Sequence, residues 1–541
     1  MRKETPITFL LIIIGIALII NVGSFGVVES SDARYAEIAR EMYNSNDYLH
    51  PNLLNIHHYH KPPFTYQITA LAYNLFGVNS FTARFFLQLS VLLQIWLIFQ
   101  IALLLFSNKN TALYSAIIYT SFPLLLISSR NLTTDSFLTT FALLSVYSWL
   151  KYIKTSKTLY LYIFATALGL GFYTKGPVIF IVPVIFIIAY KSFNKSKYKF
   201  SMHHLWASLL FLITGFWWYV FLIKDNPAFL DYFLGKQTIE RFSKNAFNRT
   251  EPFWYFVLFA PLIGAPWLLV LPYLLKVNKK IIDKNKIIKI LILSISIPLI
   301  FFSISSSKRI LYILPLYGFL ALLTSHLLVF INDRQKKVVY RSVFAFYAVL
   351  LLAIIVSSFF NINFNIPVTA VLVSISVLLL LIWILLTKKI NLVHKPIVVS
   401  LIMTVFLLII SSYLMSVNQL KINSSQPVTD FIKNIHPENK EILIYNTRKP
   451  SIAFEMNRDI ISIYNNSNDL NRETQFEKDL LWKKYLININ NEKEKYDLSK
   501  KIKDSQTILI SYKASEKDTI LQSLTNFYKN KKKLGKYIVY Y

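Results

Sequence analysis

The sequence predicts a polytopic α-helical membrane protein that ends in a small α/β domain. Hydrophobic residues make up 54% of the 541 residues, and the mean hydropathy is +0.45. Long apolar stretches recur from the N-terminus to about residue 416, and each is close to the roughly 20 residues that one bilayer crossing requires. Beyond residue 420 the composition turns polar and charged, which indicates a second, soluble domain.

Thirteen apolar stretches are long enough to be candidate spans. They cover residues 7–27, 84–106, 111–129, 136–152, 159–174, 176–190, 205–223, 253–275, 288–304, 310–331, 342–360, 367–387 and 396–416. No small-x-small cleavage site follows the first stretch, so we interpret it as a retained anchor. We therefore expect a transmembrane domain over residues 1–420, with a first outer loop at 28–83, and a soluble domain over 421–541.

The distribution of positive charge predicts the topology. The chain carries 58 Lys and Arg against 28 Asp and Glu, and every second predicted loop is rich in Lys or Arg. Cytoplasmic loops carry this excess, so the N-terminus is expected inside and the domain at 421–541 outside the cytoplasm. Because topology explains the charge and no nucleic-acid-binding signature occurs, nucleic acid is not an expected partner.

Ten cations break this rule, because they fall on the predicted outer face. They are Lys61, Arg84, Arg130, Lys175, Lys236, Arg241, Lys244, Arg249, Lys308 and Arg309. Snorkelling or ion pairing is the ordinary explanation for any one of them. Ten together favour an anionic ligand at the outer membrane face, such as the phosphate of a lipid carrier, which converging Arg and Lys bind well.

The stretch 30–64 concentrates ionisable groups beside the membrane, where they are costly unless they function. Asp32 opens a helical pattern that predicts a short interfacial helix. A carboxylate here, or Asp135 at the start of the fourth span, could act as a general base while cations stabilise a leaving phosphate. The alternative for each acid is a helix cap.

Two further features of this stretch concern metals and rigidity. His57, His58 and His60 are candidate metal ligands, although their spacing follows no fixed pattern. Two prolines follow Lys61 and restrict its backbone, which would hold a binding cation in place. The chain has no cysteine, so disulfides and thiol catalysis are excluded.

A set of motifs in order along residues 1–330 resembles the ArnT family, the bacterial aminoarabinose lipid A transferases related to the protein O-mannosyltransferases. The motifs are DARYAEIAREM, HKPPFTYQ, LFGVNSFTARF, TTDSF, YTKGP, TIERF, EPFWYF, APW and SSSKRILYILPLYGFLALL. The resemblance implies a GT-C membrane glycosyltransferase with thirteen spans in the bacterial cytoplasmic membrane. Its donor would be a sugar on undecaprenyl phosphate, and its acceptor lipid A, another glycolipid or a protein at the outer face.

The resemblance also implies roles for single residues. By motif position, Lys61, Arg241, Lys308 and Tyr312 resemble lipid-phosphate contacts. Arg34 resembles the arginine of the first loop, and Asp135 resembles a second family carboxylate. We therefore expect Asp32 and Asp135 as catalytic residues, and Arg34, Lys61, Arg241, Lys308 and Tyr312 as lipid-phosphate ligands.

Three departures from the family pattern stand in the motifs. The family's Asp-Glu-x-Arg is replaced by Ser31-Asp32-Ala33-Arg34, which leaves open whether Asp32 or Asp135 is the key carboxylate. His60 stands where the family has Glu, and Thr238 where it has His. Since those two positions carry the family's metal site, no metal ligand is assigned here, and dependence on a divalent metal stays open.

Residues 421–541 alternate β-like runs with helical patterns. Strands are expected at 442–445, 460–464, 508–512 and 537–541, and helices at 476–486 and 515–528. Two rival functions remain. A lipid or ion transporter or flippase would place charges within spans or break its helices in pairs. An accessory membrane protein would bind a partner through the soluble domain and would not require the ten outer cations.

Overall fold

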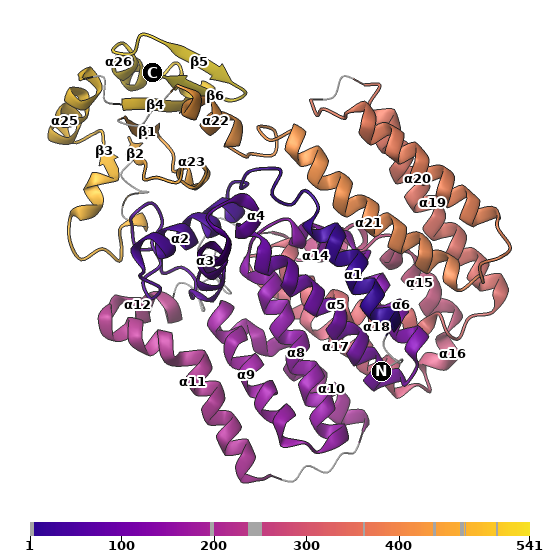
Figure 1. Ribbon diagram of the computed structural model, residues 1–541. Coiled ribbons are helices and arrows are strands. Elements are labelled where there is room, and N and C mark those ends of the chain that lie inside the picture. Colours follow the sequence, from indigo (N-terminus) through magenta and orange to yellow (C-terminus); the bar gives the residue numbers. More distant parts are fainter. Residues whose placement is uncertain are drawn as a thin grey trace. The chain divides into compact units, whose positions relative to one another are not determined.

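A computed structural model describes residues 5–194, 200–235, 251–360, 363–435, 440–465, 470, 472–504 and 507–541 (Figure 1). The chain divides into two compact units. The helical unit comprises Met1–Ile20, Leu87–Arg130 and Thr134–Leu414. The sheet unit comprises Asn21–Phe86, Asn131–Thr133 and Met415–Tyr541. The first outer loop, predicted as part of the transmembrane domain, therefore groups with the C-terminal residues.

Each of the thirteen predicted spans coincides with one helix or helix pair. In chain order these are α1 (Thr5–Ile19), α5 (Phe85–Phe106), α6 (Lys109–Thr120) with α7 (Pro123–Ser129), α8 (Thr134–Thr155), α9 (Thr158–Lys175), η1 (Pro177–Phe180) with α10 (Ile181–Phe193), α11 (Met202–Asp225), α14 (Tyr255–Ile263) with α15 (Trp267–Val277), α17 (Lys286–Ile304), η3 (Ile310–Ile313) with α18 (Leu314–Leu327), α19 (Asp333–Ser357), α20 (Val368–Leu386) and α21 (His394–Val417). Short helices α12 (Ala228–Asp231) and α16 (Lys279–Ile282) lie between them. Among the described residues, seven helices are long and apolar enough to cross a membrane, or nine if each bent pair is one span.

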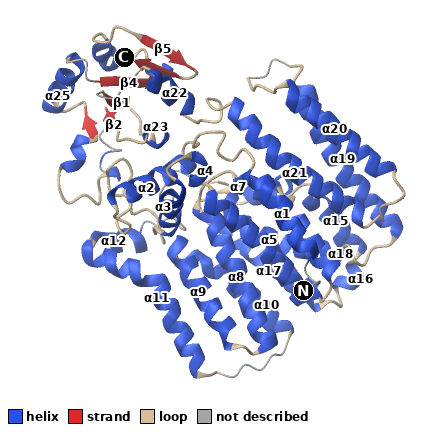
Figure 2. Cartoon of the chain, viewed as in Figure 1, coloured by secondary structure: helices blue, strands red, loops and turns tan. Residues whose placement is uncertain are grey.

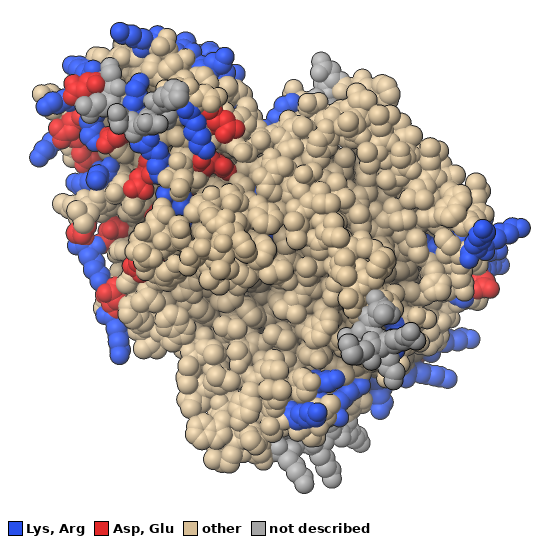
Figure 3. All heavy atoms as spheres, in the orientation of Figure 1, with Lys and Arg blue, Asp and Glu red and all other residues tan. Residues whose placement is uncertain are grey.

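The surface of the helical unit fits a membrane protein. Apolar side chains such as Leu212, Ile213 and Leu372 are half or more exposed, as expected where lipid replaces water. The face in Figure 3 is almost uncharged, with Lys and Arg gathered along one edge of this unit. The fold class predicted from the sequence, a multi-span helical membrane protein with a C-terminal α/β domain, is confirmed.

The first helix ends earlier than predicted. The apolar pattern runs to residue 27, but α1 stops at Ile19 and Asn21 adopts a left-handed φ of 57°. Residues 21–27 instead belong to the sheet unit, where Gly23 packs directly against Phe81 and Gly26 against Ser424 and Glu455. A side chain at either glycine would collide with these neighbours, which hydropathy alone could not reveal.

Two helix pairs are broken within the apolar region. α6 and α7 meet at 63°, and α14 and α15 meet at 100°. Pro123 begins α7 and Pro266 directly precedes α15, and proline removes a helical hydrogen bond. The two breaks are joined, because Trp267 Nε1 donates a hydrogen bond of 3.0 Å to Ser121 Oγ. The Ser121 hydroxyl and the Trp267 indole N–H, one at each break, therefore satisfy each other in the core.

Helices α8, α9, α10 and α11 run side by side in Figure 1. α9 and α11 approach closely because each contributes a glycine, and the Gly169 Cα lies 3.4 Å from where a Gly215 Cβ would be. A Cβ at Gly169 would collide with Thr214 Oγ1, which already bonds the Leu210 carbonyl at 2.8 Å. Small residues at such contacts are typical of helix packing in membranes.

The sheet unit carries a six-stranded mixed sheet in the order β3-β2-β1-β4-β6-β5 (Figure 2). The strands are β1 (Glu441–Tyr445), β2 (Ile461–Tyr464), β3 (Leu486–Asn488), β4 (Thr507–Tyr512), β5 (Lys531–Leu534) and β6 (Tyr537–Tyr540). β3, β2, β1 and β4 are parallel, while β6 is antiparallel to both β4 and β5. Helices α22 (Gln426–Asn434), α23 (Pro450–Met456), α25 (Glu492–Lys503) and α26 (Thr519–Thr525) and the turns η4 (Leu481–Lys484) and η5 (Lys513–Ser515) connect them.

The four predicted strands are confirmed as β1, β2, β4 and β6. β3 and β5 were missed, because β3 has three residues and β5 is a run of lysines on the sheet edge. The predicted helix at 476–486 is wrong, since it contains only the turn η4 and the start of β3. Phe476 is buried against the ring of Tyr59, so tertiary contact overrides the helical pattern there.

The first loop forms three helices, α2 (Ser31–Ser45), α3 (Phe64–Phe76) and α4 (Ser80–Ala83). The short helix predicted near Asp32 is confirmed as α2. It is not half-exposed as expected for an interfacial helix, since ten of its fifteen residues are buried. Both α3 and α23 pack against it, so the first loop and the C-terminal residues together bury this helix.

We predict that Gly169→Ala destabilises the protein. The added methyl group must displace Thr214 against the α11 backbone, and such overpacking costs about 1–3 kcal/mol. The measurement is the midpoint of thermal unfolding of the detergent-solubilised protein. Gly15→Ala is the matched control, because its Cβ would meet Leu92 at an ordinary 3.5 Å. Equal midpoints for the two variants would contradict the packing argument.

Candidate functional site

Asp32 is a buried, fully bonded carboxylate in the first turn of α2. It is 2% exposed, and Arg84 Nη2 donates to its Oδ2 at 2.5 Å. The backbone N–H of Val28 donates to Oδ2 at 2.9 Å, and that of Leu132 donates to Oδ1 at 2.8 Å. Asp32 is not an N-cap, since α2 begins at Ser31 after Ser30. Its carboxylate joins three segments of the sheet unit.

Arg84 is the ion-pair partner of Asp32. From the sequence it was predicted only as one of the ten outer cations. Its side chain is 0% exposed, and its Cζ lies 4.2 Å from the centre of the Phe25 ring. Besides Asp32, it donates to the carbonyl oxygens of Val22 (3.0 Å), Phe25 (3.2 Å) and Gly26 (3.1 Å). Arg84 thus satisfies the backbone of the irregular segment that follows α1, and its charge is used structurally.

A second polar cluster lies on the same helix. Arg40 makes a bidentate pair with Glu37, with both bonds at 2.7 Å, and all three of Glu37, Arg40 and Glu41 are buried. The Glu41 carboxylate accepts the backbone N–H groups of Leu54 (2.5 Å) and Asn55 (3.0 Å). Burial, and then the neighbouring Glu37 carboxylate, raise the pKa of Glu41. This cluster holds the 53–57 turn in place.

The predicted ligand Lys61 follows a group of aromatic side chains. The His58 and His60 rings meet edge to face with centroids 4.2 Å apart, and Tyr59 lies 5.1 Å from Phe476. Burial lowers the pKa of His60 to about 3, helped by the positive charges of Arg472, Arg34, Lys61 and Arg448. Burial, the neighbouring His60 and the charges of Arg34, Arg448 and Arg472 lower the pKa of His58 well below its ordinary value, so both rings are neutral at physiological pH.

Whether His57, His58 and His60 could bind a metal depends on the side chains that lie close to them. Over the residues that the structure describes, no group of three or more His, Cys, Asp and Glu side chains could hold a metal ion. His57 uses Nδ1 to contact Asn52 Oδ1 at 2.6 Å. Of the two family metal positions, His60 contacts other rings and Thr238 lies outside the described residues.

In the helical unit, the predicted residues Asp135 and Tyr312 meet around a third residue. Asp135, in the first turn of α8, forms an ion pair with Lys175 Nζ at the C-terminal end of α9. The same ammonium group lies 4.3 Å from the centre of the Tyr312 ring. The Asp135 and Lys175 side chains are 12% and 8% exposed, so this cation is held by a carboxylate and an aromatic face.

Two further outer cations, Lys308 and Arg130, donate hydrogen bonds to backbone carbonyl groups. Lys308 is 5% exposed, and its Nζ donates to the Glu251 carbonyl oxygen at 2.7 Å. Arg130 donates to the carbonyl oxygens of Leu18 (3.1 Å) and Leu408 (2.9 Å), which ties α1 to α21. Arg241 lies outside the described residues, as do Lys236, Lys244 and Arg249. Arg84 and Arg130 are therefore structural members of the ten outer cations.

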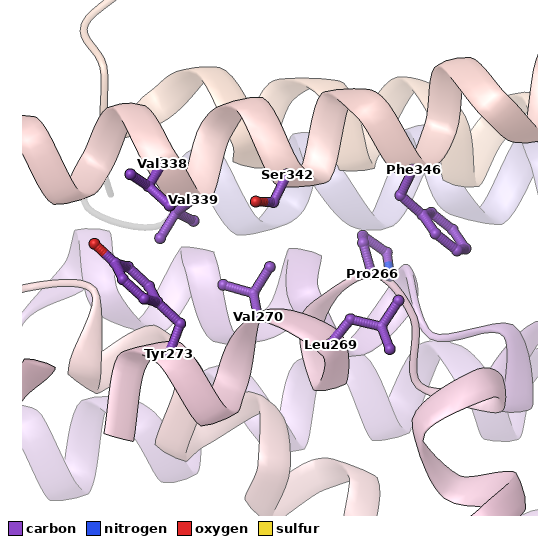
Figure 4. A pocket seen from close by; sticks show the side chains of 8 residues that line it. All are labelled: Pro266, Leu269, Val270, Tyr273, Val338, Val339, Ser342 and Phe346. Atoms are coloured by element: carbon purple, nitrogen blue, oxygen red, sulfur yellow. The ribbon is translucent and has the colours of Figure 1, made fainter. Parts of the chain in front are cut away.

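A hollow between α15 and α19 is unrelated to these residues. Figure 4 shows Tyr273, Val270 and Leu269 facing Val339, Ser342 and Phe346 across it. Its volume is about 320 Å³. Its lining is mainly apolar, and none of the predicted site residues contributes to it. It is a packing gap between two membrane helices that offers no cationic group for a phosphate.

Comparisons with known proteins support the resemblance. Residues 60–219 match the family described as dolichyl-phosphate-mannose-protein mannosyltransferase. An undecaprenyl phosphate-α-4-amino-4-deoxy-L-arabinose arabinosyl transferase of Proteus mirabilis is 30% identical over 299 residues, which is 54% of this chain and 54% of that protein. The corresponding transferase of Serratia proteamaculans is also 30% identical, over 300 residues. The chain spans about half the length of the curated relatives it matches.

The fold comparison extends over the whole chain. The crystal structure of ArnT from Cupriavidus metallidurans bound to undecaprenyl phosphate matches with a TM-score of 0.79 at 18% identity, covering 100% of this chain and 98% of that one. The chain therefore has the fold of that structure: a multi-span helical membrane protein with a C-terminal mixed sheet domain. In fold the chain is similar to ArnT, and over 54% of its length its sequence is similar to the aminoarabinose transferases, which agrees with the resemblance seen in the motifs.

We predict that Asp32→Asn destabilises the fold. Removing one charge of a buried ion pair leaves Arg84 uncompensated and costs about 3–5 kcal/mol. The thermal unfolding midpoint should fall clearly. Asp333→Asn is the matched control, because Asp333 pairs with Lys336 but is 76% exposed, where solvent screens the ion pair and its loss should change stability little. An Asp32→Asn variant as stable as the wild type but inactive would instead support the predicted catalytic role.

We also predict that stability falls on acidification through His60. Its native pKa of about 3 is below the ordinary 6.5, so below pH 6.5 the unfolded state binds a proton that the native state does not. Unfolding therefore becomes easier by about 1.4 kcal/mol per pH unit below 6.5. Thermal midpoints at pH 7.5 and 5.0 should differ less for His60→Gln than for wild type. His203→Gln, at an exposed histidine, should retain the wild-type difference.

Proposed function

We propose that the protein is an integral-membrane glycosyltransferase that moves a sugar from a polyprenyl phosphate, such as undecaprenyl phosphate, to an acceptor outside the cytoplasm. The observation that carries this proposal is the full-length fold match to ArnT together with the motif-matched cations Arg34 and Lys61. The sequence relatives are named as arabinosyl transferases that use undecaprenyl phosphate-linked aminoarabinose, which supports a pentose donor. Lipid A, another glycolipid or a protein remains the acceptor class.

The reaction follows from this assignment. An acceptor oxygen attacks the anomeric carbon, the bond between that carbon and the lipid phosphate oxygen breaks, and the phosphate leaves with an added negative charge. Arg34, Lys61, Arg241, Lys308 and Tyr312 are the proposed lipid-phosphate ligands, because fixed cations stabilise charge that develops on a leaving group. Lys175 joins this set, since Tyr312 and Asp135 hold its ammonium group.

The two proposed catalytic carboxylates differ in their surroundings. Asp32 accepts four hydrogen bonds from Arg84, Val28 and Leu132, which leaves its lone pairs engaged, so we assign it a positioning role for the first loop. Asp135 accepts from a lysine ammonium group, that of Lys175, rather than from a guanidinium and two backbone N–H groups, and is the better candidate for a base. A phosphate acceptor would already be ionised and would need no base.

The orientation in the membrane belongs to the same proposal. Segments rich in Lys and Arg, such as 276–289 and 334–341, are assigned to the cytoplasmic side, because positive charge is retained there. The N-terminus is then cytoplasmic and the domain at 421–541 extracytoplasmic, in a bacterial cytoplasmic membrane. Placing the sheet domain outside is consistent with a donor that is a lipid-linked sugar rather than a nucleotide sugar.

A lipid transporter or flippase is the second candidate. The two broken helix pairs, α6 with α7 and α14 with α15, are a feature that this alternative predicts. Transporter breaks usually expose backbone groups or charges to a substrate. Here Ser121 and Trp267 bond each other across the two breaks, and both are buried. This closure favours the enzyme over the transporter.

We predict that Lys61→Ala lowers sugar transfer at least tenfold, because one charge-assisted bond to phosphate contributes about 1.5–3 kcal/mol. The assay incubates purified protein with undecaprenyl phosphate-linked aminoarabinose and lipid A, and mass spectrometry detects the product. Lys389→Ala, in a predicted cytoplasmic loop, is the control and should retain activity. Movement of the donor across vesicles without any transfer product would contradict the enzyme and support the flippase.

A further inference from the structure

The turn η4 and the residue before it present two neighbouring leucines to solvent. Leu480 is 67% exposed and Leu481 is 76% exposed. Within the described part of residues 421–541, the other exposed large hydrophobic side chains, Tyr496 and Phe527, stand singly in the sequence. Single exposed apolar residues are common on soluble domains, whereas adjacent ones form a small patch of the kind that marks an interaction site.

The turn holds this leucine pair in a fixed position. The next residue, Trp482, packs against a cluster formed by Ile56, Tyr464, Leu470 and Leu486. The Leu481 N–H donates to Asp479 Oδ1 at 2.9 Å, and the Lys483 N–H donates to the Leu480 carbonyl oxygen at 3.1 Å. The leucines thus belong to a bonded turn with an anchored tryptophan, and Ile56 joins that turn to the first outer loop.

The segment that leads into the turn is tied to the first loop as well. Glu477 Oε1 accepts the backbone N–H of His57 at 2.6 Å. Arg448, which follows β1, pairs with Glu473 and donates to the Leu53 carbonyl oxygen. Both acids that precede the turn are therefore bonded within the protein.

Three lysines flank the leucine pair. Residues 478–485 read KDLLWKKY, so Lys478, Lys483 and Lys484 stand against one acid, Asp479. The Lys483 side chain is 40% exposed, with its Nζ 3.5 Å from Glu494 Oε1, and Lys484 is exposed. Apolar side chains flanked by Trp, Tyr and Lys are typical of segments at a membrane surface, because the rings suit the interface and the ammonium groups attract lipid phosphates.

We propose that this turn docks on the surface of the bilayer, with Leu480 and Leu481 inserted below the headgroups and the lysines beside anionic phospholipid headgroups. A lipid surface fits both halves of the patch, because phosphate groups lie directly above an apolar layer. A chain with membrane-spanning helices always has such a surface within reach. The contact gives the domain at 421–541 a second attachment to the membrane, besides its chain connection after α21. This inference goes beyond the proposed function and requires neither a particular sugar nor a particular acceptor.

The chain contains no cysteine, so a single introduced cysteine can be labelled selectively. The test attaches bimane to Leu481→Cys and, as the matched control, to Lys532→Cys on the exposed edge strand β5. Each full-length protein is reconstituted in nanodiscs of phosphatidylcholine and phosphatidylglycerol that include a lipid with a nitroxide near its headgroup. We expect this lipid to quench bimane about twofold more at the Leu481→Cys site than at the control site, because the label there lies at the headgroup boundary. Aqueous iodide should show the reverse order.

The lysines are tested by adding Lys483→Gln and Lys484→Gln to Leu481→Cys. Their loss should reduce lipid quenching in discs with phosphatidylglycerol and leave it unchanged in discs of phosphatidylcholine alone. Equal quenching before and after this change in both discs overturns the assignment of the lysines to headgroups.

Two other outcomes overturn the proposal as a whole. The first is lipid quenching at the Leu481→Cys site that does not exceed quenching at the control site. The second is protection from iodide without lipid quenching, because a protein surface, such as a second copy of the chain, then covers the leucines. Absence of sugar transfer by the wild type would contradict the proposed function alone.

Discussion

The buried ion pair between Asp32 and Arg84 is the interaction on which the first loop depends. Arg84 binds the carbonyl groups left open where α1 ends, and Asp32 compensates its charge while accepting the N–H groups of Val28 and Leu132. Both side chains are almost completely buried, so neither charge can be removed without leaving the other unpaired. The start of α2, and with it the placement of Arg34, follows from this pair.

Charge in this protein is used in two ways. Arg84 and Arg130 are buried and bind backbone carbonyls, which holds irregular segments and helix ends together. Lys175 is instead held by a carboxylate and an aromatic ring, and Lys61 lies beside a neutral histidine pair. The ten outer cations are therefore a mixture, and only part of the group is available to a phosphate.

Some residues of the candidate site were predicted from the sequence, and others were not. Asp135 and Tyr312 were named from motif positions, and the structure brings both to Lys175. Asp32 was predicted as a base, and the structure bonds its carboxylate to Arg84, Val28 and Leu132, partners from distant segments that a single sequence does not indicate. Only one feature of the sequence indicated a role for Arg84, namely its position on the predicted outer face. The contacts of Arg448 and Glu477 with the first loop had no signal in the sequence, since each spans about 400 residues.

The sequence by itself determined the class of structure. Apolar length located all thirteen helical segments, and β-branched runs located the four central strands, because both depend on local composition. Only the tertiary structure decided where α1 stops, that α2 is buried, and that residues 476–486 do not form a helix. Each of these outcomes is set by contact with a segment far away in the chain, namely Phe81 and Ser424, α23, and Tyr59. Such contacts have no local signature in a single sequence.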